Sequence, residues 1–268
     1  MINLMKADFY RMKRTKSIYI LVGILAACAI LATIFSFQME HTSISKKLIQ
    51  QASGLADMMT MVVAGPFLAG MIICNDFQTK TIHDAILYAN GRRTVVFGKL
   101  LTYSMLVMLL VLPYAICTLV GLFSGASFSS AYSHSIDSVF FSLLANETGT
   151  KIDGIVVLKL IAILITVMLI YAARMSVNII LVYTIRKPVV VVGLGIAIQL
   201  ALSLIGPLSV SSELGEALIG WTPFASYGSV LNLSVGWGKI TSTAGVCLAF
   251  MGMINAITAG IFQHSEIK

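Results

Sequence analysis

Residues that could catalyse a reaction are few and scattered in this sequence. A membrane-bound zinc protease needs His-Glu-x-x-His on one helix, so that two histidines one turn apart face the metal. The four histidines lie far apart, at positions 41, 83, 134 and 264, and none stands in that motif. His83 has an acidic neighbour in Asp84, but adjacent residues on a helix do not face each other. These patterns predict neither a catalytic residue nor a metal site.

A nucleotide-binding loop is also missing from the pattern of residues. Such a loop reads Gly, four residues, Gly-Lys and then Ser or Thr. Gly98-Lys99 is followed by Leu100, and Arg93 stands where the first glycine would be. The four cysteines lie in apolar stretches without Cys-x-x-Cys spacing, so they indicate no disulfide or metal site. We therefore expect this chain to bind no cofactor of its own.

Six long apolar runs hold most of the remaining residues. They cover residues 18–37, 58–74, 100–123, 160–183, 189–205 and 240–262. Each is close to the roughly 20 residues that a helix needs to cross a hydrocarbon core about 30 Å thick. Peptide groups in lipid must be bonded internally, and the runs do not alternate as strands of a barrel would. The sequence thus predicts an all-α polytopic membrane protein with six transmembrane helices, and residues 1–268 forming a single transmembrane domain.

Composition and charge agree with this assignment. Hydrophobic residues make up 58% of the chain and charged residues 11%, against about 25% charged in soluble proteins. With six crossings both termini share a side, and placing them in the cytoplasm puts thirteen of the 18 Lys and Arg residues there. Cytoplasmic loops carry such an excess. The net charge of +7 is then explained by orientation and by attraction to membrane lipid, not by binding to nucleic acid.

The polar segment 75–99, between the second and third runs, predicts a short helix outside the membrane. Thr81 can cap the start of that helix, Asp84 lies near the positive end of its dipole, and Asn90-Gly91 can end it. An apolar stripe follows at helical spacing: Ile82, Ala85, Ile86 and Ala89. A helix of about two turns needs something to pack on. That support is either the ends of its own spans or a groove on a soluble partner.

Residues 1–16 predict a second helix outside the spans. Ile2, Met5, Phe9 and Met12 recur at helical spacing, and lysines and arginines occupy the other faces. Such a helix suits the inner headgroup region, with its apolar side toward lipid. The alternative is a disordered basic tail that serves only to orient the first span.

The segment 75–99 resembles the first cytoplasmic loop of type-2 permeases of bacterial ATP-binding-cassette transporters. That loop has an acidic residue after the second span, Gly-Thr-Ile, a short helix, a basic turn, and Gly-Lys entering the third span. The matching positions here are Asp76, Thr81-Ile82, Tyr88, Gly91-Arg92-Arg93 and Gly98-Lys99. The chain departs from the pattern at Lys80, where the family has glycine. Residues 5–17 are similar to the family's interfacial helix.

The resemblance implies that the chain is the membrane-spanning permease subunit of an ATP-driven exporter. ATP and Mg would be bound by a separate cytoplasmic ATPase, and a second permease, identical or different, would complete the path. The short helix would be a coupling helix that rests on the ATPase. The residues that the resemblance assigns to this contact are Asp76, Lys80, Thr81, Ile82, Asp84, Ile86, Tyr88, Arg92 and Arg93.

The resemblance also implies short outer re-entrant helices between spans five and six, and a place in the bacterial plasma membrane. Small permeases of this kind often serve immunity or resistance, so amphipathic or antimicrobial peptides, such as lantibiotics, are the expected cargo. Lipid-linked molecules or ions are the next candidates for the cargo. The competing hypothesis is a non-transporting membrane subunit that anchors or senses through its outer loops.

A few polar residues lie inside the predicted spans and form a candidate transport path. They are Tyr171, Arg174 and Asn178 on one face of the fourth span, Gln199 and Ser203 on the fifth, and Asn255 and Thr258 on the sixth. The alternative for these pairs is hydrogen bonding between helices, and for Arg174 it is reaching out to lipid phosphates. Small residues at fourfold spacing predict close helix packing: Gly193, Ala197 and Ala201, and Gly252, Ala256 and Gly260.

Overall fold

The computed structural model describes residues 2–41, 56–89, 91–123, 154–209, 222–224 and 235–265, and within those ranges it contains helices and no strand. The helices are, in chain order, α1 (Ile2–Arg14), α2 (Lys16–His41), α4 (Asp57–Ala69), the π-helix η2 (Gly70–Cys74), α5 (Asn75–Gln78), α6 (Thr81–Tyr88), α7 (Arg92–Phe123), α9 (Gly154–Met175), α10 (Val177–Ile185), α11 (Pro188–Ser209) and α14 (Trp237–His264).

Five helical segments in the described part of the chain are long and apolar enough to cross a membrane. They are Lys16–Phe35, Asp57–Gln78, Arg92–Cys117, Val157–Ile185 and Trp237–His264. These segments mark the chain as a polytopic membrane protein. The predicted span 189–205 corresponds to α11, whose apolar part, Pro188–Ser203, is shorter than the other five. The predicted outer re-entrant helices fall in 206–237, most of which lies outside the described residues.

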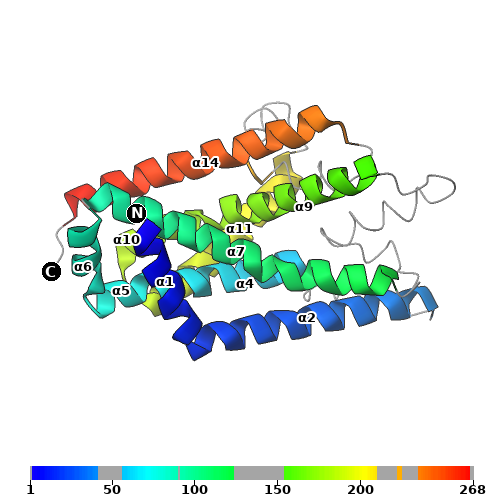
Figure 1. The fold of residues 1–268 in the computed structure, drawn as a ribbon, viewed down its shortest axis with the longest axis horizontal. Helices are drawn as coiled ribbons and strands as arrows, with labels where there is room; N and C mark the ends of the chain where they lie inside the picture. The colour runs from blue at the N-terminus through cyan, green and yellow to red at the C-terminus, as the bar shows by residue number, and fades with distance from the viewer. Residues whose placement is uncertain are drawn as a thin grey trace.

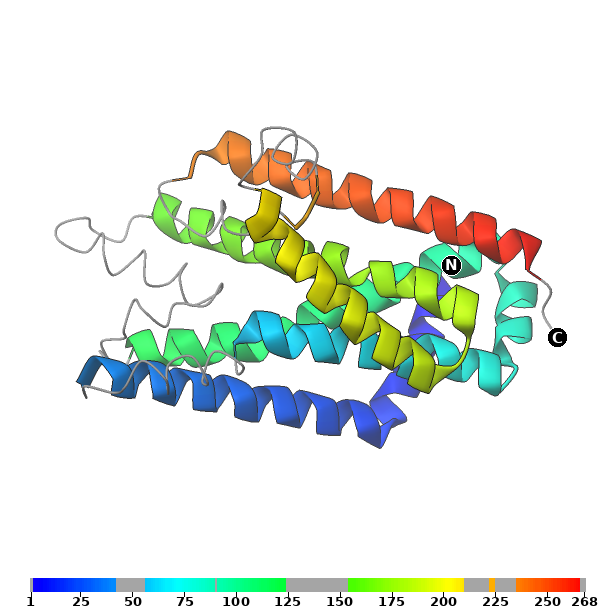
Figure 2. The same cartoon turned by 180° about the vertical axis from the view of Figure 1, so that it is seen from behind.

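The long helices run side by side along one axis, and α1 and α6 gather at one end of them (Figure 1). Here α6 lies across the bundle axis, and the turn from α10 to α11 lies at the same end (Figure 2). We call this the basic end, because the helices that meet there carry many of the basic residues: Lys6, Arg11, Lys13, Arg14, Lys80, Arg92, Arg93, Arg186 and Lys187. Charge and helix arrangement thus distinguish the two ends of the bundle.

The N-terminal helix α1 forms as predicted but packs differently. Its face at four-residue spacing, Leu4, Asp8 and Met12, is turned toward the bundle, with Asp8 and Met12 buried and Leu4 packed against the core. Helix α1 lies against α7. The prediction that its apolar side would face lipid is therefore wrong for Met12, which is buried, and for Phe9, which packs against the core. Lys6, Lys13 and Arg14 are exposed, as the predicted polar face requires.

Close packing of the bundle depends on a glycine that the sequence pattern did not single out. A Cβ at Gly195 on α11 would lie 2.6 Å from the Cβ of Pro66 on α4. By contrast, nothing lies within 4 Å of a Cβ placed at Gly193, Gly252 or Gly260. Among the described residues, the glycines of the two predicted small-residue stripes therefore mediate no close contact with another helix.

Candidate functional site

A buried group of charged side chains joins three helices at the basic end. The Nζ atom of Lys99, on α7, lies 2.6 Å from Oδ1 of Asp8 on α1 and 2.6 Å from Oδ2 of Asp76 on α5. Arg11, on α1, places Nη2 2.5 Å from the other oxygen of Asp76. Lys99, Asp8 and Asp76 are buried, whereas the Arg11 side chain is 46% exposed. We call these four residues the charge cluster.

In the charge cluster, burial disfavours the charged carboxylates and pairing with cations favours them. Burial raises the pKa of Asp8 above its ordinary value, because desolvation penalises the charged carboxylate, and the neighbouring Lys99 opposes this. Two carboxylates share one ammonium group in the interior, and Arg11 supplies the second positive charge from the edge. Each side chain is therefore compensated only while α1, α5 and α7 hold this arrangement.

The charge cluster also holds the start of α6. The hydroxyl of Thr81 donates to Oδ1 of Asp76 over 3.1 Å, the same oxygen that Arg11 binds. The predicted role of Thr81 as the helix cap is wrong: the capping position is Lys80, which makes no side-chain cap bond. Thr81 is the first residue of the helix, and its hydroxyl bonds to Asp76. This contact ties α6 to the same carboxylate that links α1 and α7.

The apolar stripe of α6 packs on the chain's own bundle. Ile82 is buried, and Ala85 and Ile86 pack against the core. Of the two supports left open by the sequence, the stripe therefore uses the ends of its own spans. The last two residues of the helix point away: Leu87 is 79% exposed and Tyr88 89%. Leu87 was not among the predicted contact residues. The available signal was its position: Leu87 directly follows Ile86, so it lies off the apolar stripe and on the exposed side of the helix.

The other predicted contact residues divide by their exposure. Lys80, Asp84 and Arg93 are exposed. Arg92 is half-buried, and its Nη1 lies 3.0–3.1 Å from the carbonyl oxygens of Phe262, Gln263 and Ser265 at the end of α14. Cationic groups stabilise the final carbonyls of a helix. Arg92 thus fastens the start of α7 to the end of α14, which leaves Lys80, Asp84, Tyr88 and Arg93 at the surface.

Lys80 occupies the place of the expected glycine and adopts a glycine-like backbone. Its φ is 57° and its ψ is 9°, in the left-handed region where a side chain costs about 1–2 kcal/mol per residue. The position between α5 and α6 therefore has the local geometry for which glycine is the natural choice.

Replacing Lys80 with Gly should raise the free energy of unfolding by roughly 0.5–1 kcal/mol, because relief of the left-handed strain exceeds the added entropy of the unfolded chain. Melting temperature in detergent is the measurement. Lys80→Ala is the matched control, since it removes the charge but keeps the Cβ, and it should leave stability unchanged. Equal gains in both variants would trace the effect to charge and contradict the backbone explanation.

Three of the predicted path residues meet where α9 breaks into α10. Arg174 is 2% exposed, and its guanidinium carbon lies 5.1 Å from the ring centroid of Phe224. Gln199 Nε2, on α11, donates to the carbonyl oxygen of Arg174 over 3.0 Å. Asn178 Nδ2 donates to the hydroxyl of Tyr103 over 3.4 Å. Arg174 thus lies inside the bundle and not along its outer surface.

Two of the other path residues bond within their own helices. Ser203 and Thr258 donate to carbonyls of their own helices, Leu200 and Ile254, over 2.7 Å. Tyr103 was missed by the sequence analysis, yet its hydroxyl donates to the carbonyl oxygen of Gly65 over 3.0 Å and accepts from Asn178. Asn178 and Gln199 therefore connect neighbouring helices, as interhelical hydrogen bonds do in membrane bundles.

Comparison with known proteins assigns no family. Neither the protein-family models nor the curated proteins contain a match to this chain.

Proposed function

We propose that this chain is the membrane-spanning permease subunit of an ATP-driven exporter in the bacterial plasma membrane. It works with a separate cytoplasmic ATPase, which binds ATP and Mg, and with a second permease. In this proposal α11 also crosses the membrane, as the fifth of six spans, and both termini are cytoplasmic. One observation carries the proposal: α6 projects Leu87 and Tyr88 from the basic end, while its start is fastened to the charge cluster.

The exposed end of α6 has the composition of a docking site. A large aliphatic and an aromatic side chain stand next to each other, almost fully exposed, at the tip of a helix that is otherwise packed. Tyrosine is enriched among the residues that dominate protein interfaces, where it fills a pocket on the partner. Asp84 on α6 and Arg93 at the start of α7 are exposed and can supply a polar rim to the docking site.

The anchored start of α6 suits the transmission of a movement. Helix α6 lies between α5, which continues the second span, and α7, the third span. Thr81 is bound to Asp76, and Asp76 is bound to Lys99 on α7 and to Arg11 on α1. A displacement of α6 would therefore move several helices together, because leaving either buried carboxylate unpaired is costly.

In this proposal the basic end faces the cytoplasm. Helix α6 and the exposed basic residues of α1 lie at one end of the bundle, where the positive-inside rule places the cytoplasm. An ATPase in the cytoplasm would then meet the exposed tip of α6. The charge is accounted for by orientation, so the proposal includes no nucleic acid.

The cargo proposal rests on the resemblance. Amphipathic or antimicrobial peptides are the first candidates, and lipid-linked molecules or ions come next. The buried group of Arg174, Asn178 and Gln199 supports a polar point on the path, because an intramembrane arginine held inside a bundle favours a functional role. The exposed small-residue faces of α11 and α14 leave room for a second permease to approach closely.

The test removes the exposed tip of α6 without touching its packed face. The chain is expressed with the cassette ATPase encoded by a neighbouring reading frame, and Leu87→Ser is combined with Tyr88→Ser. We expect affinity for the ATPase and stimulated ATP turnover to fall about tenfold or more, as for residues central to an interface. Melting temperature should stay unchanged, because both side chains are exposed.

Tyr10→Ser is the matched control, since Tyr10 is an exposed aromatic residue on α1 and not on α6. Ile86 is unsuitable as a test position because it packs against the core. Full ATPase binding and turnover in the double variant would refute the docking role of α6. A loss of the same size in Tyr10→Ser would mean that ATPase binding does not depend specifically on the tip of α6.

A further inference from the structure

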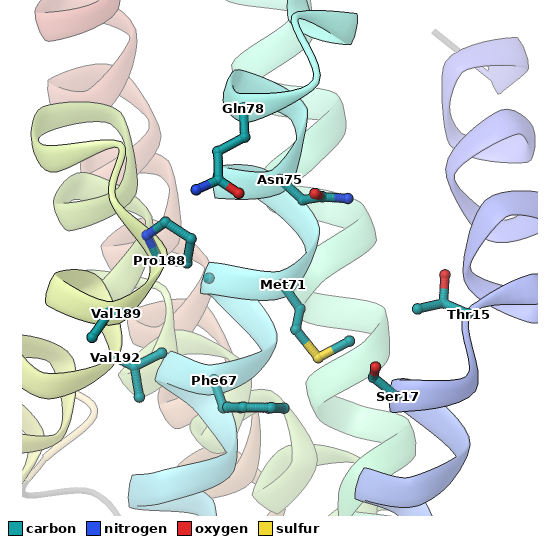
Figure 3. A pocket seen from close by; sticks show the side chains of 10 residues that line it. Thr15, Ser17, Phe67, Met71, Asn75, Gln78, Pro188, Val189 and Val192 are labelled. Atoms are coloured by element: carbon teal, nitrogen blue, oxygen red, sulfur yellow. The ribbon is translucent and has the colours of Figure 1, made fainter.

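A groove on the outside of the bundle reaches the basic end. Its floor is the continuous segment of α4, η2 and α5, one wall is the junction of α1 with α2, and the other is the start of α11 (Figure 3). The groove holds about 500 Å³, within the roughly 300–1,000 Å³ of sites that bind small molecules. None of the candidate path residues lines it.

The lining of the groove is polar on one side and apolar on the other. Asn75 and Gln78 form the end nearest the basic end, and Thr15 and Ser17 lie on the α1–α2 wall (Figure 3). The opposite wall and the floor are apolar: Pro188, Val189, Val192, Phe67 and Met71. The surface is therefore suited to a ligand that is itself amphipathic.

The apolar floor continues along the span. Met59, Val63 and Phe67 are exposed at four-residue spacing on α4, and Met71 follows at the same spacing in the groove. Twelve residues of helix cover roughly 18 Å. That length is close to half of a hydrocarbon core about 30 Å thick, which is the depth of one leaflet. One acyl chain therefore matches the track.

Two exposed lysines adjoin lining residues of the groove in the sequence, one beside each wall. Lys16 stands between Thr15 and Ser17, and Lys187 directly precedes Pro188. Both are exposed, and neither forms a salt bridge in the part of the chain that the structure describes. Helix α2 begins at Lys16 and helix α11 begins at Pro188, directly after Lys187, which adds the positive ends of two helix dipoles. The groove thus combines an apolar track with a positive mouth.

We infer that the groove binds one anionic glycerophospholipid. Its phosphate lies between Lys16 and Lys187, its polar headgroup meets Asn75 and Gln78, and one acyl chain follows Met71 and Phe67 into the leaflet. Charge selects an anionic over a zwitterionic headgroup. The inference depends on membrane insertion of the chain and not on the proposed partnership with an ATPase.

The test places a fluorescent indole at the groove. Trp221 and Trp237 are replaced by Phe, and Val189→Trp introduces one indole at an exposed position of the groove wall. The protein is reconstituted into vesicles in which either phosphatidylglycerol or phosphatidylcholine carries bromine on its acyl chains. Brominated phosphatidylglycerol should quench the indole with a relative binding constant at least about threefold higher than brominated phosphatidylcholine.

Two further variants serve as controls for lipid preference. Leu248→Trp in the same background puts the indole on an exposed face of α14, which lines no part of the groove, and its lipid preference should be close to one. Adding Lys16→Gln and Lys187→Gln to Val189→Trp should bring the preference there to about one with the melting temperature unchanged. Equal quenching by the two lipids at Val189→Trp would overturn the inference. Protection from both lipids, as a peptide or a second copy in the groove would give, would overturn it as well. Because the measurement needs no ATPase, it is independent of the test of α6.

Discussion

Replacing Lys99 with Met should lower the free energy of unfolding by about 3–5 kcal/mol, the cost of leaving buried charges without their partner. Lys99 is the only side chain that contacts both Asp8 and Asp76 among the ion pairs described. Methionine fills a similar volume but cannot compensate either carboxylate. The measurement is the midpoint of unfolding in mixed micelles of rising denaturing-detergent content, supported by the melting temperature.

The neighbouring Arg11 provides the control. Its side chain is 46% exposed, and exposed ion pairs contribute only about 0–1 kcal/mol, so Arg11→Met should have a small effect. Asp8→Asn added to Lys99→Met should recover part of the loss, because it removes one of the two uncompensated charges and leaves Asp76 with Arg11. Equal effects of Lys99→Met and Arg11→Met would mean that the cluster is open to water.

The charge cluster could not be predicted from the sequence. Asp8 and Lys99 are 91 positions apart, and no periodicity connects them. Their pairing depends on the direction in which α1 leaves the first span, which is a property of the tertiary packing. One signal was present: Asp8 lies between Leu4 and Met12 at four-residue spacing, so a carboxylate occupies an otherwise apolar face. Such a position requires a buried cation.

Hydropathy predicted where the spans lie but not where their helices begin. The third apolar run starts at residue 100, whereas α7 begins at Arg92. The intervening helical residues, 92–99, include Arg92, bound to the end of α14, and Lys99, bound to two carboxylates. A hydropathy pattern excludes these charged residues from a span because a charge in lipid is costly. In the fold their hydrogen-bond and ion-pair partners offset that cost, so the helix extends through them.

Small residues at regular spacing predict close packing but do not identify the partner that packs against them. Gly193, Ala197 and Ala201 have the spacing of a helix contact, yet all three are exposed. Gly195 is two residues from Gly193, which turns it roughly 200° around the helix at about 3.6 residues per turn. That rotation places Gly195 against Pro66 and Gly193 toward the outside.

Replacing Gly195 with Ala should destabilise the fold by about 1–3 kcal/mol, the usual cost of forcing an extra methyl group into a well-packed interior. The new Cβ would lie 2.6 Å from the Cβ of Pro66 and 3.0 Å from Oδ1 of Asn178. The proline ring cannot rotate away, so α11 must separate from α4. The measurement is the same unfolding midpoint used for Lys99→Met.

Gly193→Ala changes the same residue type on the same helix without meeting an atom within 4 Å. It should be neutral or stabilising by up to about 1 kcal/mol, because alanine restricts the unfolded chain and favours the helix. Only Gly195→Ala should therefore lose stability. A loss of stability in Gly193→Ala equal to that in Gly195→Ala would mean that the contact face of α11 is assigned to the wrong side. In that case Gln199, one turn after Gly195, could not reach the carbonyl of Arg174, and the buried polar group would lose the bond that joins α11 to α9.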